Sequence, residues 1–305
     1  MPSQRLYRLD YLAKVGLWST FTSRIQHQAL FLEYFYGLLD TLFAVHFATS
    51  STESHMMKNA LLAAALITAY ASGNAMAQDA KPATELSFNA AVTSDYRYRG
   101  ISQTRLMPAL QGGADVVVNA NGVYAGVWAS SIKWTRDAGG DGDIEIDLYA
   151  GKRGELSAGL AYDVGVLTYV YPSNKLAHVP GFVSANTTEV YGQLAYGAGL
   201  IKYSHAVTNL FGFADSKNSG YLELAANIDA GNGITVNLHA GRQRVAHYAA
   251  ATYTDWRLGV TRQFGGVTGA LACIGTNAGK LAYASPANGK FLGKSAVVLT
   301  LSKTF

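Results

Sequence analysis

The sequence lacks the features that stabilise or anchor many exported proteins. One cysteine, Cys273, occurs in 305 residues, which excludes an intrachain disulfide. Only six prolines are present, and none falls inside the alternating segments described below; proline cannot donate to a β-ladder, so this spacing favours paired strands. No apolar run reaches the roughly 20 residues that a membrane-spanning helix needs. Membrane insertion would therefore have to use strands.

Charge is mixed rather than one-sided. The chain carries 24 Lys and Arg against 20 Asp and Glu, a formal net charge of +4, with no basic block. This balance gives no reason to expect nucleic acid as a partner. The sequence also predicts no cofactor and no metal ion.

An export signal lies inside the sequence instead of at its first residue. Lys58 precedes an apolar run over residues 60–71, and small residues follow it. Residues 56–77 are therefore predicted to be a secretory signal peptide. Because such a signal is read at a nascent amino terminus, residues 1–55 are interpreted as a mis-annotated upstream extension. The alternative is a real N-terminal domain followed by a transmembrane helix, for which the apolar run is too short.

From residue 78 onward the chain consists of segments of about ten residues in which apolar and polar side chains alternate. The predicted strands are 85–99, 109–118, 123–132, 143–151, 159–171, 188–196, 200–207, 219–228, 234–242, 252–263, 267–276 and 295–305. An even strand count is typical of single-chain bacterial outer-membrane barrels. The predicted fold class is all-β, an antiparallel transmembrane β-barrel of about 12 strands over residues 78–305.

The connections between these strands alternate in length. Short turns are predicted at 119–122, 151–158, 197–199, 229–233 and 264–266, and long loops at 100–108, 133–142, 172–187, 208–218, 243–251 and 277–294. In outer-membrane barrels the short turns are periplasmic and the longer loops extracellular. A soluble sandwich has no reason to separate loop lengths in this way.

One face of the predicted strands is apolar, and its lipid-facing residues include Leu86, Ile146, Leu224, Leu238, Leu258 and Leu301. A soluble barrel would bury this face, and the period alone does not distinguish the two arrangements. The signal peptide, the loop asymmetry and an amphipathic last strand ending at Phe305, an expected outer-membrane C-terminal signal, favour a lipid-facing apolar surface. Interfacial aromatic girdles are predicted from Tyr96, Tyr98, Tyr169, Tyr171, Tyr253, Trp256, Phe264 and Phe305.

Four segments carry a resemblance to a known family: SDYRYRGISQT at 94–104, PALQGGAD at 108–115, EIDLYAG at 145–151 and YDVGVLTYVYP at 162–172. Together they resemble the TorF family of porins over nearly all of residues 85–305. The resemblance implies an outer-membrane barrel. The expected location is the outer membrane of a Gram-negative bacterium, which the protein reaches after export directed by its signal peptide. It carries over no substrate and no catalytic residue. The expected partners are outer-membrane lipid, the barrel-assembly machinery and a small polar solute or ion.

Charged side chains on the opposite face are the candidate pore-lining residues, because rings of charge are how pores select solutes. They are Asp95, Arg97, Arg99, Asp115, Asp143, Glu145, Asp147, Asp163, Lys202, Glu223 and Arg257. The hypothesis is that Arg97 and Arg99 oppose the acids at 143, 145 and 147 across the lumen and create a transverse field. The alternative is an internal salt-bridge network that fills a closed barrel.

The number of strands limits the width of the barrel interior. About eight strands give an interior filled by side chains, and sixteen to eighteen give an aqueous channel. Twelve strands predict a narrow channel for ions or small polar solutes. The second candidate is a closed structural or surface-recognition barrel with long loops. The hypothesis of an outer-membrane hydrolase has less support, because no serine has an identifiable base and orienting partner by spacing. The acids at 141 and 143 suit a solvated turn or a weak cation site. No enzymatic activity is predicted.

The mature protein is expected to begin at Gln78, because Ala75 and Ala77 supply the small-residue cleavage site. N-terminal sequencing of protein isolated from outer membranes checks this. Peptides from residues 1–55 in that mature material would contradict the interpretation of an upstream extension.

Overall fold

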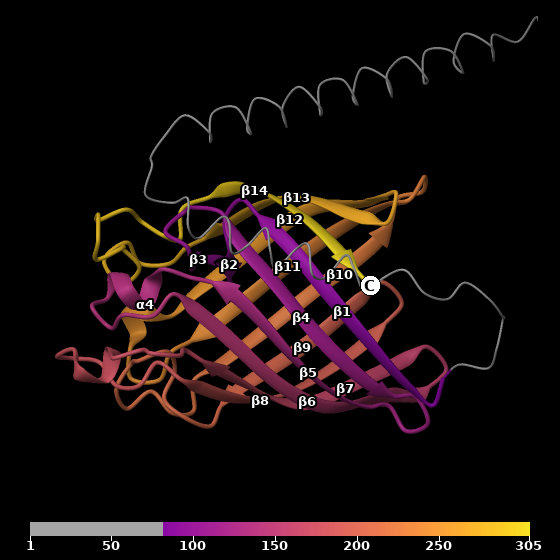
Figure 1. Ribbon diagram of the computed structural model, residues 1–305, viewed down its shortest axis with the longest axis horizontal. Coiled ribbons are helices and arrows are strands. Elements are labelled where there is room, and N and C mark those ends of the chain that lie inside the picture. Colours follow the sequence, from indigo (N-terminus) through magenta and orange to yellow (C-terminus); the bar gives the residue numbers. More distant parts are fainter. Residues whose placement is uncertain (1–81) are drawn as a thin grey trace, which may run out of the picture. The chain divides into compact units, whose positions relative to one another are not determined.

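The computed structural model describes residues 82–305, and the expectations for the upstream extension, the signal peptide and the cleavage site at Ala75, Ala77 and Gln78 lie outside these residues. Within them, twelve strands form one closed antiparallel barrel (Figure 1). The wall strands are β1 (Thr84–Thr93), β4 (Ala109–Val118), β5 (Val123–Ser131), β6 (Ile144–Ser157), β7 (Leu160–Val170), β8 (Thr187–Tyr196), β9 (Gly199–Ala206), β10 (Gly220–Asp229), β11 (Ile234–Arg244), β12 (Tyr253–Phe264), β13 (Val267–Thr276) and β14 (Ala296–Thr304).

Closure depends on β1, which pairs with β4 along its whole length and with β14 over its second half. Asn89 lies opposite Thr304 and Thr93 opposite Thr300. The backbone of Phe88 also exchanges hydrogen bonds with that of Phe305. Each wall strand therefore has two neighbours, so the sheet has no open edge. The predicted fold class is confirmed.

Most predicted strand boundaries agree with the structure within two residues, with two exceptions. The first wall strand ends at Thr93 rather than near residue 99, because the chain leaves the wall there and turns into the barrel. The fourth wall strand, β6, runs on to Ser157 and leaves only a two-residue turn before β7, so the predicted reversal at 151–158 is wrong. Ladder pairing continues through Gly151, opposite Gly165, so this glycine does not break the strand.

The apolar face points outward, as predicted. Large apolar side chains of the wall are exposed, including Leu86 at 61%, Leu258 at 56% and Leu224 at 53%. Their neighbours along the same strands, such as Ser87, Glu223 and Arg257, point into the lumen, since side chains alternate across a strand. An exposed apolar band of this extent suits contact with lipid instead of water.

The aromatic prediction is only partly correct. Trp256 and Phe264 are 46% and 42% exposed on the outer face. By contrast, five tyrosines expected at the interface lie inside the barrel, where Tyr96, Tyr169, Tyr171 and Tyr253 are buried and Tyr98 is partly buried. They occupy inward-facing positions near the end with the long loops, where their hydroxyls meet carboxylates and one another.

The six long connections lie at one end of the barrel and the five short turns at the other. The long connections contain a two-stranded hairpin, β2 (Arg97–Tyr98) and β3 (Ile101–Ser102), and the short helices α4 (Trp134–Asp137), η1 (Leu176–His178) and η2 (Ala249–Ala251). Figure 1 shows β2, β3 and α4 gathered at this end. No helix within residues 82–305 is long and apolar enough to cross a membrane.

The outward face of β11 gives a direct stability test. Replacing Leu238 by Arg should lower the free energy of unfolding by about 2–4 kcal/mol, because it places a charge in the apolar band near mid-strand. The matched control is Asn237→Arg, one residue away at the same depth but facing the lumen, and it should cost clearly less. Reversible denaturant unfolding in lipid vesicles measures both. Equal losses for the two variants would contradict the face assignment.

Candidate functional site

The segment between β1 and β4, residues 94–108, folds into the barrel and is called here the lumen hairpin. Its turn is formed by Arg99 and Gly100, which have φ angles of 46° and 79°. Positive φ at both central residues is the signature of a tight type I′ turn. A Cβ on Gly100 would lie 2.5 Å from Thr276 Cγ2 and 2.8 Å from Asp255 Cβ. Only glycine fits here, because the turn presses against the wall at β12 and β13.

Arg99 links the tip of the lumen hairpin to the far side of the barrel. Its guanidinium donates to both carboxylate oxygens of Glu189 on β8, at 3.0 and 2.7 Å. It also donates to Gln243 Oε1 on β11, at 2.7 Å. The side chains of Arg99 and Glu189 are 7% and 1% exposed. A buried two-pronged pair of this kind is both strong and directional.

Aromatic rings complete the surroundings of Arg99. Its guanidinium carbon lies 4.7 Å from the centre of the Tyr98 ring and 4.2 Å from that of Tyr221 on β10. The Tyr169 hydroxyl donates to Glu189 Oε2 at 3.2 Å and lies 2.6 Å from the Tyr98 hydroxyl. Burial opposes the charged guanidinium, but the Glu189 carboxylate and the tyrosines outweigh it, so the pKa of Arg99 is raised above its usual value.

The base of the lumen hairpin is held by Asp95. Its carboxylate accepts hydrogen bonds from Arg97 Nε at 2.8 Å and from the hydroxyls of Ser102 and Thr104. Arg97 also donates to the carbonyl of Lys294 at 2.7 Å, which ties the hairpin to the loop before β14. The hairpin is thus fixed at its tip by one arginine and at its base by another.

Tyrosine hydroxyls hold the carboxylates of the wall from β4 to β8. Tyr96 on the hairpin donates to Glu145, which is 2% exposed. The same pattern recurs with Tyr149 donating to Asp115 at 2.6 Å and Tyr124 donating to Asp163 at 2.5 Å. Asp147 faces the lumen beside Glu145, and its Oδ1 is buried without a hydrogen-bond partner among the described residues.

The wall from β10 to β12 carries a histidine between two acids. His239 Nε2 lies 2.8 Å from Asp255 Oδ2, and its Nδ1 lies 3.3 Å from Glu223 Oε1. The Tyr221 hydroxyl donates to Asp255 at 2.9 Å and lies 3.0 Å from His239 Nε2. This cluster braces three neighbouring strands below the turn of the lumen hairpin.

The structure brings most of the predicted pore-lining residues into the lumen, but in different pairs. Arg99 meets Glu189 instead of the acids at 143, 145 and 147, and Arg97 pairs with Asp95. Asp143 lies in the loop before β6, where it is 42% exposed and pairs with Arg136. Lys202 stacks over the Tyr191 ring at 4.1 Å.

Sequence reasoning missed several residues that make this network. Glu189, Gln243 and Asp255 are the main ones, each under 4% exposed. Glu189 and Asp255 sit at inward-facing positions of predicted strands, so the alternation could have placed them in the lumen, whereas Gln243 falls in the predicted loop 243–251 because β11 runs on to Arg244. The alternation contains no signal for their contact with a hairpin 90 or more positions away in sequence.

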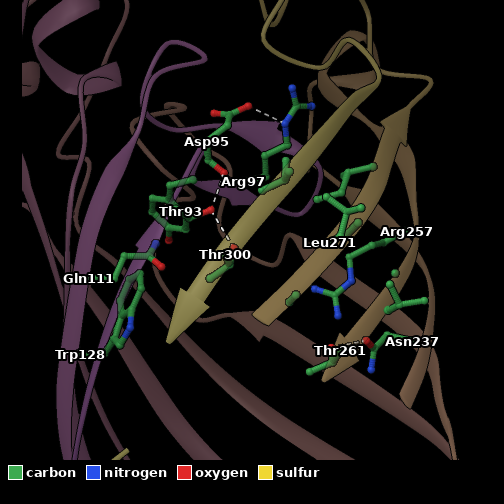
Figure 2. Close-up of a pocket in the computed structure, with 17 residues that line it drawn as sticks. Thr93, Asp95, Arg97, Gln111, Trp128, Asn237, Arg257, Thr261, Leu271 and Thr300 are labelled. Atoms are coloured by element: carbon green, nitrogen blue, oxygen red, sulfur yellow. Dashed lines mark hydrogen bonds and ion pairs between the residues drawn. The ribbon is translucent and has the colours of Figure 1, made fainter. Parts of the chain in front are cut away.

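Below the lumen hairpin lies a cavity of about 230 Å³, lined on one side by β11–β14 and roofed by Asp95, Tyr96 and Arg97. Figure 2 shows Arg257 extending from β12 into this space, with Thr300 of β14 beside it and Gln111 and Trp128 on the other side. The lumen is therefore divided into a tightly bonded half and an open half.

Comparison with known proteins gives a family and distant structural likenesses. Residues 77–305 match a family model described as a bacterial protein of unknown function, Gcw_chp. No curated protein sequence matches the chain. Similar solved structures include the NanC porin, at 10% identity over 72% of this chain and 99% of that one, with a TM-score of 0.44. LpxR from Salmonella typhimurium gives 13% identity, 72% and 99% coverage and a TM-score of 0.39.

Loss of the buried arginine should free the lumen hairpin. Arg99→Ala leaves Glu189 buried and unpaired, an arrangement that costs about 3–5 kcal/mol. When the hairpin is released, water can reach Glu189 and this cost is no longer paid in full. The variant should therefore open the hairpin more often, and hydrogen exchange of the hairpin amides should speed up by about 100-fold or more.

The matched control is Arg136→Ala, which removes a half-exposed pair with Asp143 and should leave hairpin exchange unchanged. Mass spectrometry of peptides covering residues 94–108 reads both variants. Unchanged protection in Arg99→Ala would show that the ion pair does not hold the hairpin.

Proposed function

The chain belongs to the Gcw_chp family of bacterial proteins of unknown function, and on that premise we propose that it is an outer-membrane channel. Under this proposal it is exported by its signal peptide, inserted by the barrel-assembly machinery and surrounded by outer-membrane lipid. It passes ions or small polar solutes and catalyses no reaction. Its resemblance to the TorF porins agrees with this role.

The outward apolar band supports the membrane location. The closed ladder gives each wall strand a hydrogen-bonded neighbour on both sides, and a spanning structure in hydrocarbon must pair its backbone groups internally. Arg262 and Lys303 lie near the short-turn end, stacked over Phe264 and Phe305 at 5.2 and 4.7 Å. Long basic side chains beside aromatic rings are typical of the membrane interface, where the charge can reach the headgroups.

One observation carries the channel proposal. The lumen is lined by charged side chains, and the lumen hairpin fills only part of it. Below the lumen hairpin the cavity remains open, and polar side chains such as Asn237, Thr261 and Thr300 form part of its lining. In the half with the long loops, the lumen hairpin narrows the passage. Charged side chains face the lumen from both walls, with Asp115, Asp147 and Asp163 on β4, β6 and β7 and Arg257 on β12 beside the Glu223–His239–Asp255 cluster. A narrow charged passage suits ions and small polar solutes.

A closed structural or surface-recognition barrel is the second candidate. It is favoured by the dense bonding around Arg99, which could seal the long-loop end permanently. In a recognition barrel the six long connections would provide the contact surface.

A hydrolase has less support. Among residues 82–305 no histidine contacts a serine hydroxyl. His239 contacts Asp255, Glu223 and Tyr221, and His205 contacts Asn218. A serine nucleophile needs a base within hydrogen-bond reach.

Planar-bilayer recording separates the channel from the closed barrel. Wild-type protein should give small single-channel currents, and the double variant Arg99→Ala, Glu189→Ala should give larger ones, because it releases the hairpin without leaving a lone buried charge. Arg136→Ala serves as the control and should conduct like wild type. Folded protein that gives no channels, with the hairpin either held or released, would defeat the proposal and favour the closed barrel.

A further inference from the structure

The cavity below the lumen hairpin contains an arginine, Arg257, whose charge has no partner among residues 82–305. Arg257 makes no hydrogen bond, ion pair or ring contact with any residue of the described part of the chain. Its guanidinium carries five N–H donors in a planar fork, a geometry that matches a carboxylate. Figure 2 shows this group extending into the cavity.

The local charge of the cavity favours an anion. Of the residues that line it, only Asp95, Arg97 and Arg257 are charged. Asp95 and Arg97 form an ion pair at 2.8 Å with side chains 8% and 1% exposed, so their charges offset each other. Arg257 is left as the uncompensated charge among the lining residues, and the acids near it on the same wall, Asp255 and Glu223, pair with His239. On the opposite wall, Asp163 and Asp115 accept hydrogen bonds from tyrosine hydroxyls of β5 and β6.

The wall beside Arg257 is apolar although it faces the lumen. Ile274 lies directly opposite Arg257 in the ladder, and Ala272 lies opposite Val298, which is 6% exposed. Ala270 and the Trp128 ring also line the cavity. Lumen-facing positions of a membrane barrel are ordinarily polar. This patch offers an apolar surface next to the Arg257 guanidinium.

We propose that this cavity binds a small organic monocarboxylate, with its carboxylate on Arg257 and a short apolar body against Ile274, Ala272 and Val298. The volume of about 230 Å³ is below the usual range for drug-sized ligands, so the ligand is small. This inference deepens the proposed function, since the cavity belongs to the lumen of the proposed channel.

Equilibrium binding to folded barrel in detergent tests the site without requiring conduction. Titration calorimetry with butyrate should show saturable binding, whereas butyramide and butylammonium, of similar size but neutral or cationic, should not bind. Arg257→Gln should weaken butyrate binding by about 10- to 100-fold, the contribution of hydrogen bonds to a charged group. Arg257→Lys should retain part of the affinity, because it keeps the charge and loses the fork.

The matched control is Arg262→Gln, the same change five positions along β12 on the outer face, which should bind like wild type. Comparing acetate, butyrate and hexanoate tests the apolar wall, and Ile274→Thr should reduce the gain with chain length. Absence of saturable butyrate binding, equal binding of butyramide, or no effect of Arg257→Gln in a protein with native circular dichroism would overturn the proposal.

Conductance distinguishes this failure from failure of the channel. In bilayers, butyrate should reduce the chloride current of wild type more than that of Arg257→Gln. A chloride current that butyrate leaves unchanged in both proteins would contradict the binding site but not the channel. Protein that binds butyrate in detergent but never conducts would support the site and remove the channel.

Discussion

Closure of the hydrogen-bonded wall is the constraint on which the rest of the molecule depends. A strand edge in hydrocarbon would leave a row of backbone groups without partners, so the first strand must find the last. Here β1 does so through only part of β14, with the remaining contact made by the backbones of Phe88 and Phe305. Once the ring is closed, each strand has one face in lipid and the other in a confined interior.

That confinement determines the chemistry of the lumen. Side chains excluded from lipid must be polar, yet they face one another across a narrow space where an unpaired charge is expensive. The structure resolves this with tyrosines, whose hydroxyls donate to carboxylates while their rings fill volume. Tyr96 with Glu145, Tyr149 with Asp115 and Tyr124 with Asp163 repeat one solution on neighbouring strands. The tyrosines therefore fill the lumen with their rings and satisfy its carboxylates with their hydroxyls.

The wall could be predicted from sequence because its signal is local. Alternation with period two, short turns and the positions of proline place twelve strands, and the signal peptide, the loop asymmetry and the last strand ending at Phe305 orient Leu238, Leu258 and Leu224 outward. The lumen hairpin could not be predicted in this way. The alternation of Thr93 continues through Asp95 and Arg97 as if the strand went on, and the turn at Arg99 and Gly100 is fixed by contacts with β8, β11 and β12. The inward position of the tyrosines at the long-loop end depends on the same long-range contacts. Their place near strand ends alone predicts a membrane-interface girdle, which is wrong for them.

The two halves of the lumen follow different electrostatic rules. Around Arg99 every charge has a partner, so moving the hairpin would expose Glu189 and leave Gln243 without its donor. Water entering the vacated mouth would solvate these groups, which makes opening less costly than breaking a sealed pair in a solid core. Arg257, in the other half, already faces an open cavity and needs no protein partner to be stable. Under the proposed function, such a barrel separates control of access from recognition, because Arg257 would meet the solute while Arg99 holds the hairpin.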